Sequence, residues 1–155
     1  MSTIDTLMTN EVVAVPPDQT VTEVVRLMAD SEVGAVAVVE GEALVGLFTE
    51  RDLLNRVVAK GLDPATTSVG EVATKELVTV TADTSIRVCG EKLQDMNIRH
   101  LPVVDGNRPL GIVSARDFFS HVAAGFESLI ERVQYDEQLR EDLDPYDHLG
   151  GSYGR

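Results

Sequence analysis

Apolar and polar positions along the chain follow one pattern that occurs twice. Within residues 12–58, a short apolar run precedes a helix-spaced segment, two further apolar runs and a second helix start. The first helix begins at a capping box formed by Thr20 and Glu23, and apolar residues follow at helical spacing as far as Met28. The pattern predicts a βαββα unit.

The second half of the chain repeats this order of elements. A helix is expected at about 85–95, and further helices should begin at Thr49 and Ser114. Glu-Gly and Asp-Gly turns join the last two strands of each copy. The predicted strands are residues 12–15, 36–39 and 44–48 in the first copy and 77–80, 101–104 and 110–113 in the second.

A shift of 65 positions aligns the two copies without a gap. Residues 33–54 then lie over residues 98–119, with glycines and charged residues in register. Two copies predict a domain with pseudo-twofold symmetry, in which each copy covers the other's apolar face. We expect the divisions to be residues 1–65, 66–125 and 126–155, the last being a C-terminal helical extension with an acidic tail.

A short motif recurs at equivalent places as GLFTERD (46–52) and GIVSARD (111–117). One interpretation is purely structural, because a Thr or Ser followed three residues later by an acid caps a helix. A cap alone, however, requires neither the upstream glycine nor the arginine. A hydroxyl and an arginine at a helix N-terminus suit phosphate, and the aspartate can accept the hydroxyls of a ribose. The combination therefore favours a nucleotide.

The net charge of −13 makes a nucleic-acid-binding surface a poor expectation. The charge is uneven, with net values of −7 in residues 1–65, −1 in 66–125 and −5 in 126–155. An anionic ligand should therefore be best tolerated by the second copy. The single cysteine, Cys89, excludes an intrachain disulfide and a cysteine-cluster zinc site.

No membrane interaction is expected, because no apolar run is long enough to span a bilayer. Residues 1–13 lack the pattern of a signal peptide, so we expect a cytoplasmic protein. We find no Ser/His/Asp order, no P-loop and no metal-ligand spacing. The expectation is a protein that is not an enzyme and holds no metal.

The βαββα order, the stretch RHLPVVD (99–105) and the two motifs resemble a tandem pair of CBS domains, also called a Bateman module, over residues 4–123. The resemblance implies an α/β (α+β) fold with two clefts between the repeats. It also implies a stand-alone regulatory module that binds AMP, ADP or ATP and signals through a homodimer or a regulated partner protein. Two alternatives stay open: a dimerisation scaffold with unoccupied sites, or a sensor of S-adenosylmethionine or NAD(H).

The resemblance also assigns residues to the two clefts. The second site would use Val13, Val33, Arg99, His100, Ile112, Ser114, Arg116 and Asp117. We expect phosphate to favour this site, because Arg99 and His100 replace Gly34 and Ala35 of the first copy. The first site would use Leu47, Thr49, Arg51, Asp52, Val78 and Ile98.

The last helix should continue well beyond the second repeat, to about Glu141, with Gly125 as its only glycine. Most of its apolar residues fall on one stripe, which can pack on the chain's own domain or on a second subunit. We favour the second subunit. The stripe comprises Phe118, Phe119, Val122, Phe126, Leu129, Ile130, Val133 and Leu139.

Overall fold

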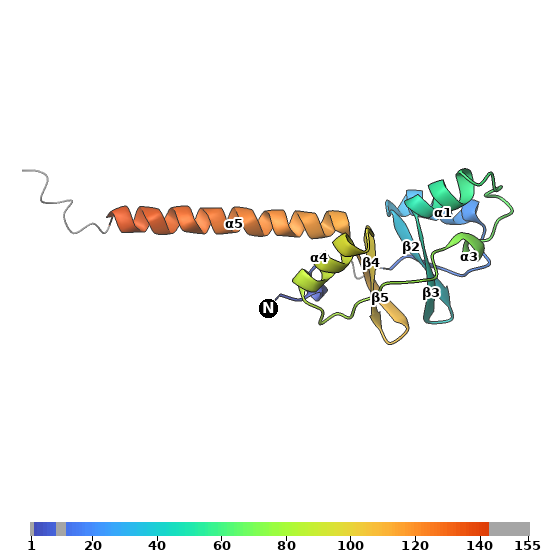
Figure 1. The fold of residues 1–155 in the computed structure, drawn as a ribbon, viewed down its shortest axis with the longest axis horizontal. Helices are drawn as coiled ribbons and strands as arrows, with labels where there is room; N and C mark the ends of the chain where they lie inside the picture. Colours follow the sequence, from blue (N-terminus) through green and yellow to red (C-terminus); the bar gives the residue numbers. More distant parts are fainter. Residues whose placement is uncertain (1, 9–11, 143–155) are drawn as a thin grey trace, which may run out of the picture. The chain divides into compact units, whose positions relative to one another are not determined.

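A computed structural model describes residues 2–8 and 12–142 (Figure 1). These residues fall into two units, which divide after Phe118. The first unit contains the first predicted repeat and the second predicted repeat as far as Phe118. The predicted acidic tail beyond residue 142 lies outside the described residues.

The first repeat has the predicted order of elements, with a second helix that changes its winding. The Thr20–Glu23 capping box is present at the start of the first long helix. After β3, a single α-helical turn passes directly into a π-helix. The elements are η1 (Ile4–Thr6), β1 (Ala14–Val15), α1 (Val21–Ser31), β2 (Ala35–Glu40), β3 (Ala43–Thr49), α2 (Glu50–Asp52) and the π-helix η2 (Leu53–Val58).

The second repeat follows the order of the first but differs at its leading strand and at its last helix, which is one long α-helix. The predicted strand 77–80 is wrong as an extended strand, because only Val80 pairs, in a parallel bridge with Val103. The first copy's strand is also short, since β1 spans two residues. The elements are α3 (Val69–Val72), α4 (Ile86–Asp95), β4 (His100–Asp105), β5 (Arg108–Ser114) and α5 (Ala115–Asp142).

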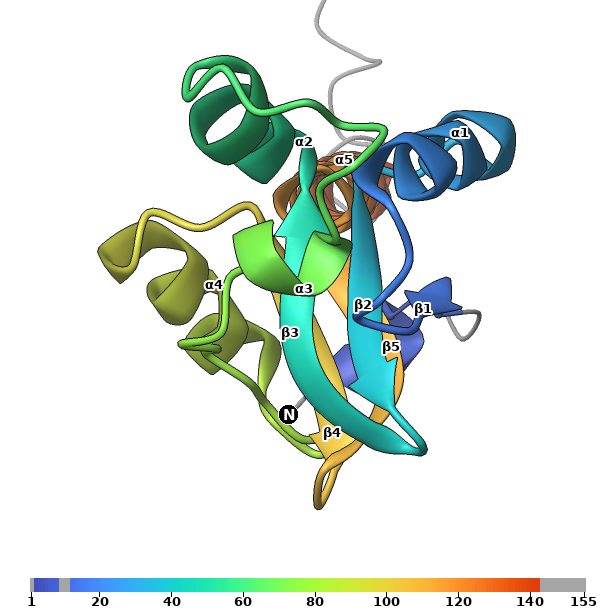
Figure 2. The same ribbon diagram turned by 90° about the vertical axis from the view of Figure 1, so that its right-hand side faces the viewer.

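The 65-residue offset seen in the sequence reappears in the register of the two hairpins, β2–β3 and β4–β5. Figure 2 shows both hairpins. β2 and β3 pair antiparallel with Ala35 opposite Thr49, and β4 and β5 pair with His100 opposite Ser114. Both hairpins carry an irregularity at the same place, after Val38 and after Val103. β3 packs against β5, which brings the two hairpins together within the first unit.

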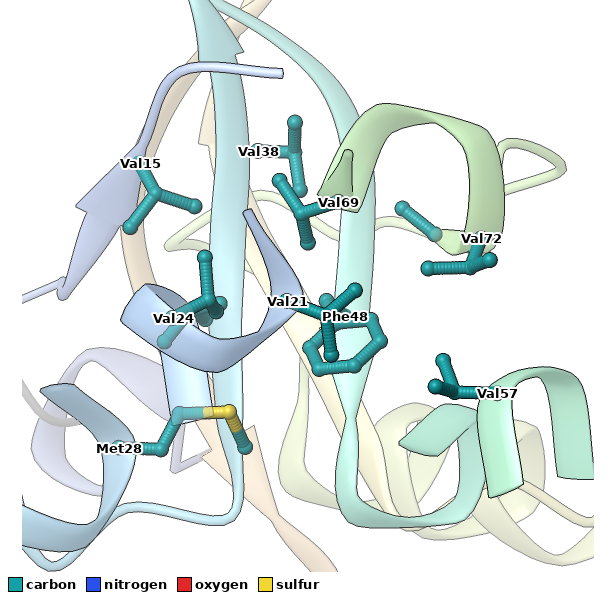
Figure 3. Packing of buried hydrophobic residues seen from close by; sticks show 11 residues of the cluster. Val15, Val21, Val24, Met28, Val38, Phe48, Val57, Val69 and Val72 are labelled. Carbon is teal, nitrogen blue, oxygen red and sulfur yellow. The ribbon is translucent and has the colours of Figure 1, made fainter. Parts of the chain in front are cut away.

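Each repeat completes its core with the segment that begins the other repeat. Val69 and Val72 of α3 are buried among the side chains of the first repeat, around Phe48 (Figure 3). Ile4 is fully buried in the core of the second repeat, where its N–H donates to the Thr84 carbonyl at 3.1 Å. This reciprocal exchange ties the two repeats into one folding unit.

Candidate functional site

A cavity of about 280 Å³ opens beside the first copy of the motif. Its lining includes all six residues predicted for the first site, from Leu47 and Thr49 at the end of β3 to Val78 and Ile98 of the second repeat. Both repeats therefore contribute to this cavity, as the resemblance implied. Its volume lies at the lower end of the range of small-molecule sites.

A larger cavity of about 970 Å³ lies beside the second copy of the motif. All eight residues predicted for the second site line it. Val13, Val33 and Ile112 give it apolar walls, and Ser114 and Asp117 stand at the start of α5. Apolar walls with a few convergent polar groups are typical of small-molecule sites.

In the first motif, the aspartate is already engaged by the protein. Asp52 is only 7% exposed, and its carboxylate accepts hydrogen bonds from the Thr49 N–H at 3.1 Å, the Thr49 hydroxyl at 3.2 Å and the Thr74 hydroxyl at 3.0 Å. The Arg56 Nε lies 3.4 Å from the same carboxylate. The Asp52 N–H donates back to the Thr49 hydroxyl at 3.2 Å, so the capping interpretation is confirmed here.

In the second motif, only half of this arrangement forms. The Asp117 N–H donates to the Ser114 hydroxyl at 3.0 Å, as a helix cap requires. The Asp117 side chain is exposed, and among the described residues its carboxylate has no hydrogen-bond or ion-pair partner. The two motifs thus differ in whether their carboxylate is free to bind a ligand. The Asp52 carboxylate is held by hydrogen bonds within the protein, whereas the Asp117 carboxylate is exposed and open to a ligand.

Three residues line both cavities: Glu50, Arg99 and His100. Two of them, Glu50 and His100, lie beside Gly34, where an added Cβ would lie 3.3 Å from the His100 Nε2 and 3.4 Å from the Glu50 carboxylate. Burial lowers the pKa of His100, and Arg99 lowers it further, while Glu50 and Asp117 act in the opposite direction. The net shift is downward, which favours a neutral imidazole at neutral pH.

The two sites differ less in Arg99 than in their other arginines. Because Arg99 and His100 line both cavities, their presence in the second copy does not by itself distinguish the two sites. The difference lies in how the other arginines are used. Arg51 donates to the Asn97 carbonyl at 3.1 Å, whereas the Arg116 side chain has no partner among the described residues.

Some lining residues were not predicted from the sequence. Thr74 follows α3 in the exchanged segment and carries no motif, so nothing in the sequence pointed to its contact with Asp52. Glu32 in the second cavity is also unforeseen. Glu50 and Ala115 hold equivalent positions in the two copies, because their N–H groups donate to equivalent carbonyls, those of Gly34 at 3.0 Å and Arg99 at 2.7 Å.

Comparison with known proteins identifies the family. The sequence profile described as "CBS domain" matches residues 4–59 and 69–124. The chain belongs to the CBS domain family. It is 39% identical over 117 residues to the CBS domain-containing protein YhcV of Bacillus subtilis, covering 76% of this chain and 83% of that protein. The solved CBS domain structure NE2398 is 30% identical, with a TM-score of 0.74 over 79% of this chain and 98% of that chain.

A further CBS-domain pair, from protein MJ0100, has the same fold, with a TM-score of 0.72 at 21% identity over 80% of this chain and 97% of that chain. That structure is a complex with 5′-methylthioadenosine and S-adenosyl-L-methionine. Within residues 2–8 and 12–142 of the present chain, no group of three His, Cys, Asp or Glu side chains is arranged to hold a metal ion. Over the same part of the chain, no helix combines the length and apolar character needed to cross a membrane.

Proposed function

We propose that this CBS-domain pair is a regulatory module that binds an adenine nucleotide, AMP, ADP or ATP, in the clefts between its repeats. The observation that carries the proposal is the larger cavity, where apolar walls from both repeats meet Ser114 at a helix start and the Asp117 carboxylate, which has no partner among the described residues. The fold neighbour with bound adenosine compounds supports an adenosine-containing ligand as the class.

Each part of such a ligand has a matching group in the second cavity. Val13, Val33 and Ile112 provide the apolar surfaces between which an adenine ring can stack. The Asp117 carboxylate accepts hydrogen bonds from the two ribose hydroxyls. The first turn of the 28-residue helix α5 and the Arg116 guanidinium attract phosphate.

We propose that the second cavity is the stronger site. A ligand in the first cavity must compete with Thr49, Thr74 and Arg56 for the Asp52 carboxylate. Displacing buried hydrogen bonds costs free energy that binding must recover. A ligand in the second cavity meets an Asp117 carboxylate that has no competing partner among the described residues.

A regulatory role is inferred in preference to a catalytic one. Ribose and phosphate contacts account for the Ser or Thr, Arg and Asp side chains of both motifs, so neither motif supplies a nucleophile or a general base. The output then passes through a homodimer or a partner protein. Signalling through such a contact needs only a ligand that binds two conformations of the module with different affinity.

A thermal-shift panel tests the ligand class. A ligand that binds only the native state raises the unfolding midpoint as its concentration rises. We expect AMP, ADP or ATP to raise the midpoint and guanosine triphosphate, as a matched control for charge, to leave it unchanged. A response to S-adenosylmethionine or NADH alone would assign a different adenosine ligand. No response to any of these compounds would favour a scaffold with unoccupied sites.

A further inference from the structure

Apolar residues follow a heptad pattern along the part of α5 that belongs to the second unit. From Phe119, apolar side chains recur at alternating intervals of three and four residues, through Val122, Phe126, Leu129 and Val133. This spacing is that of the a and d positions of a coiled coil, in which two helices pack along a 3.5-residue repeat. Phe119, Phe126 and Val133 take a positions, and Val122 and Leu129 take d positions. The next d position holds Asp136, so the apolar part of the seam ends at Val133.

The polar residues of the same segment confine this apolar seam to one side of the helix. Ile130, at an e position, widens the seam, while the outer b, c and f positions are polar except for Ala124 and Tyr135. A narrow seam with a polar outer surface is the pattern of a helix that packs on one other helix. The polar outer residues are Ser120, His121, Glu127, Ser128, Glu131, Gln134 and Gln138.

The seam is exposed in the single chain. Phe119 is 73% exposed, Phe126 63% and Leu129 53%. Helices in proteins owe most of their stability to the packing of an apolar face, so a long helix with this face in water is only marginally stable. The segment therefore requires a partner that covers the seam.

Charges beside the seam select the partner and its direction. Arg132 occupies a g position and Glu137 the following e position. In a parallel pair of identical helices, a g residue faces the e residue five positions later on the other helix, so Arg132 meets Glu137 of the second copy, and the reverse pair forms by symmetry. Neither residue belongs to an ion pair among the described residues of the single chain.

We propose that α5, from Phe119 to Glu137, pairs with the same segment of a second copy of this chain as a parallel two-stranded coiled coil. The self-complementary seam and the two Arg132–Glu137 pairs carry this assignment, which does not depend on the nucleotide. It also extends the proposed function, because Asp117 precedes the first seam residue by two positions on one continuous helix. A ligand held by Asp117 thereby acts on the helix that forms the dimer.

Sedimentation equilibrium of the full chain, from about 1 to 100 µM, tests the seam. We expect a wild-type dimer and, for Leu129→Asp, a dissociation constant raised by roughly 100-fold or more, because two carboxylates enter an apolar seam. Ser128→Asp adds the same charge one residue away at an outer position and should change the constant by less than about twofold. Circular dichroism verifies that each variant is folded. A monomeric wild-type chain, or a Leu129→Asp dimer as tight as wild type, would overturn the proposal.

Charge exchange tests the parallel direction. Arg132→Glu alone and Glu137→Arg alone should each weaken the dimer roughly 3- to 10-fold, because two attractive pairs per dimer become repulsive. The double variant restores both attractions and should return the constant to within about twofold of wild type. A double variant no tighter than the single ones would refute the parallel pairing.

Discussion

Replacing Asp52 with alanine should destabilise the first unit, while the same replacement at Asp117 should leave its stability nearly unchanged. The two aspartates hold equivalent positions in the two motifs. Asp52 is 7% exposed and accepts three hydrogen bonds, two from Thr49 and one from Thr74. The Asp117 carboxylate is exposed and has no partner among the described residues.

The expected loss at Asp52 can be worked out from these contacts. Alanine leaves the Thr49 N–H and the Thr74 hydroxyl without their acceptor, and a buried polar group without a partner costs about 1–3 kcal/mol. Both donors are partly buried, so the lower half of that range applies to each. The ion pair with Arg56, whose side chain is 49% exposed, adds about 0.3–0.5 kcal/mol. The total is about 2–4 kcal/mol.

Urea unfolding followed by circular dichroism measures both variants. The Asp52→Ala midpoint should fall with an unchanged m-value, which indicates a change in stability rather than in the surface exposed on unfolding. Asp117→Ala should stay within about 0.5 kcal/mol of wild type, as surface substitutions usually do. Equal losses in the two variants would refute the claim that only the first motif is saturated by the protein.

Three further predictions follow from the packing and from His100. Gly90→Ala should lower the thermal unfolding midpoint, because the new Cβ would lie 2.7 Å from the Phe118 Cζ. Gly125→Ala, whose new Cβ would meet nothing within 4 Å, should raise helicity and stabilise α5 by up to about 1 kcal/mol. A raised midpoint for Gly90→Ala together with a lowered one for Gly125→Ala would contradict the packing described. Ile4→Ala should cost about 2–5 kcal/mol in urea unfolding, and a loss under about 1 kcal/mol would count against the segment exchange. His100 has a lowered pKa and so binds a proton less readily in the folded chain than in the unfolded one, which means that stability should fall as the pH drops below about 6.5. Urea unfolding between about pH 5 and 7.5 should show a smaller fall in stability for His100→Gln than for wild type. Identical pH profiles for the two proteins would disprove this role.

The repeat made most of the fold predictable. A gapless offset means that evidence for an element in one copy supports the same element in the other, and both predicted hairpins and the helices at Thr20 and Ser85 are confirmed. The cavities also assemble the residues that the resemblance assigned to them. These features depend on local periodicity and on symmetry, which a sequence records directly.

Other features depend on contacts between distant segments. Ile4 stands in a mostly polar stretch, so its full burial in the second repeat follows only from the exchange of segments. The strand predicted at 77–80 has strand-like residues but pairs only at Val80, because its neighbours find no extended partner. The different states of Asp52 and Asp117 arise partly from Thr74, which the motif does not include.

The central claim is that an adenine nucleotide binds beside Asp117, and isothermal titration of the full chain tests it most directly. ATP should bind the wild-type chain, and Asp117→Ala should lower the affinity roughly 10- to 100-fold, because a carboxylate that accepts two ribose hydroxyls is lost. Asp52→Asn keeps the shape of a side chain that already bonds to Thr49 and Thr74, and it should reduce the affinity for ATP far less. Equal losses from the two variants, or no binding of ATP, ADP or AMP to the wild-type chain, would contradict the account.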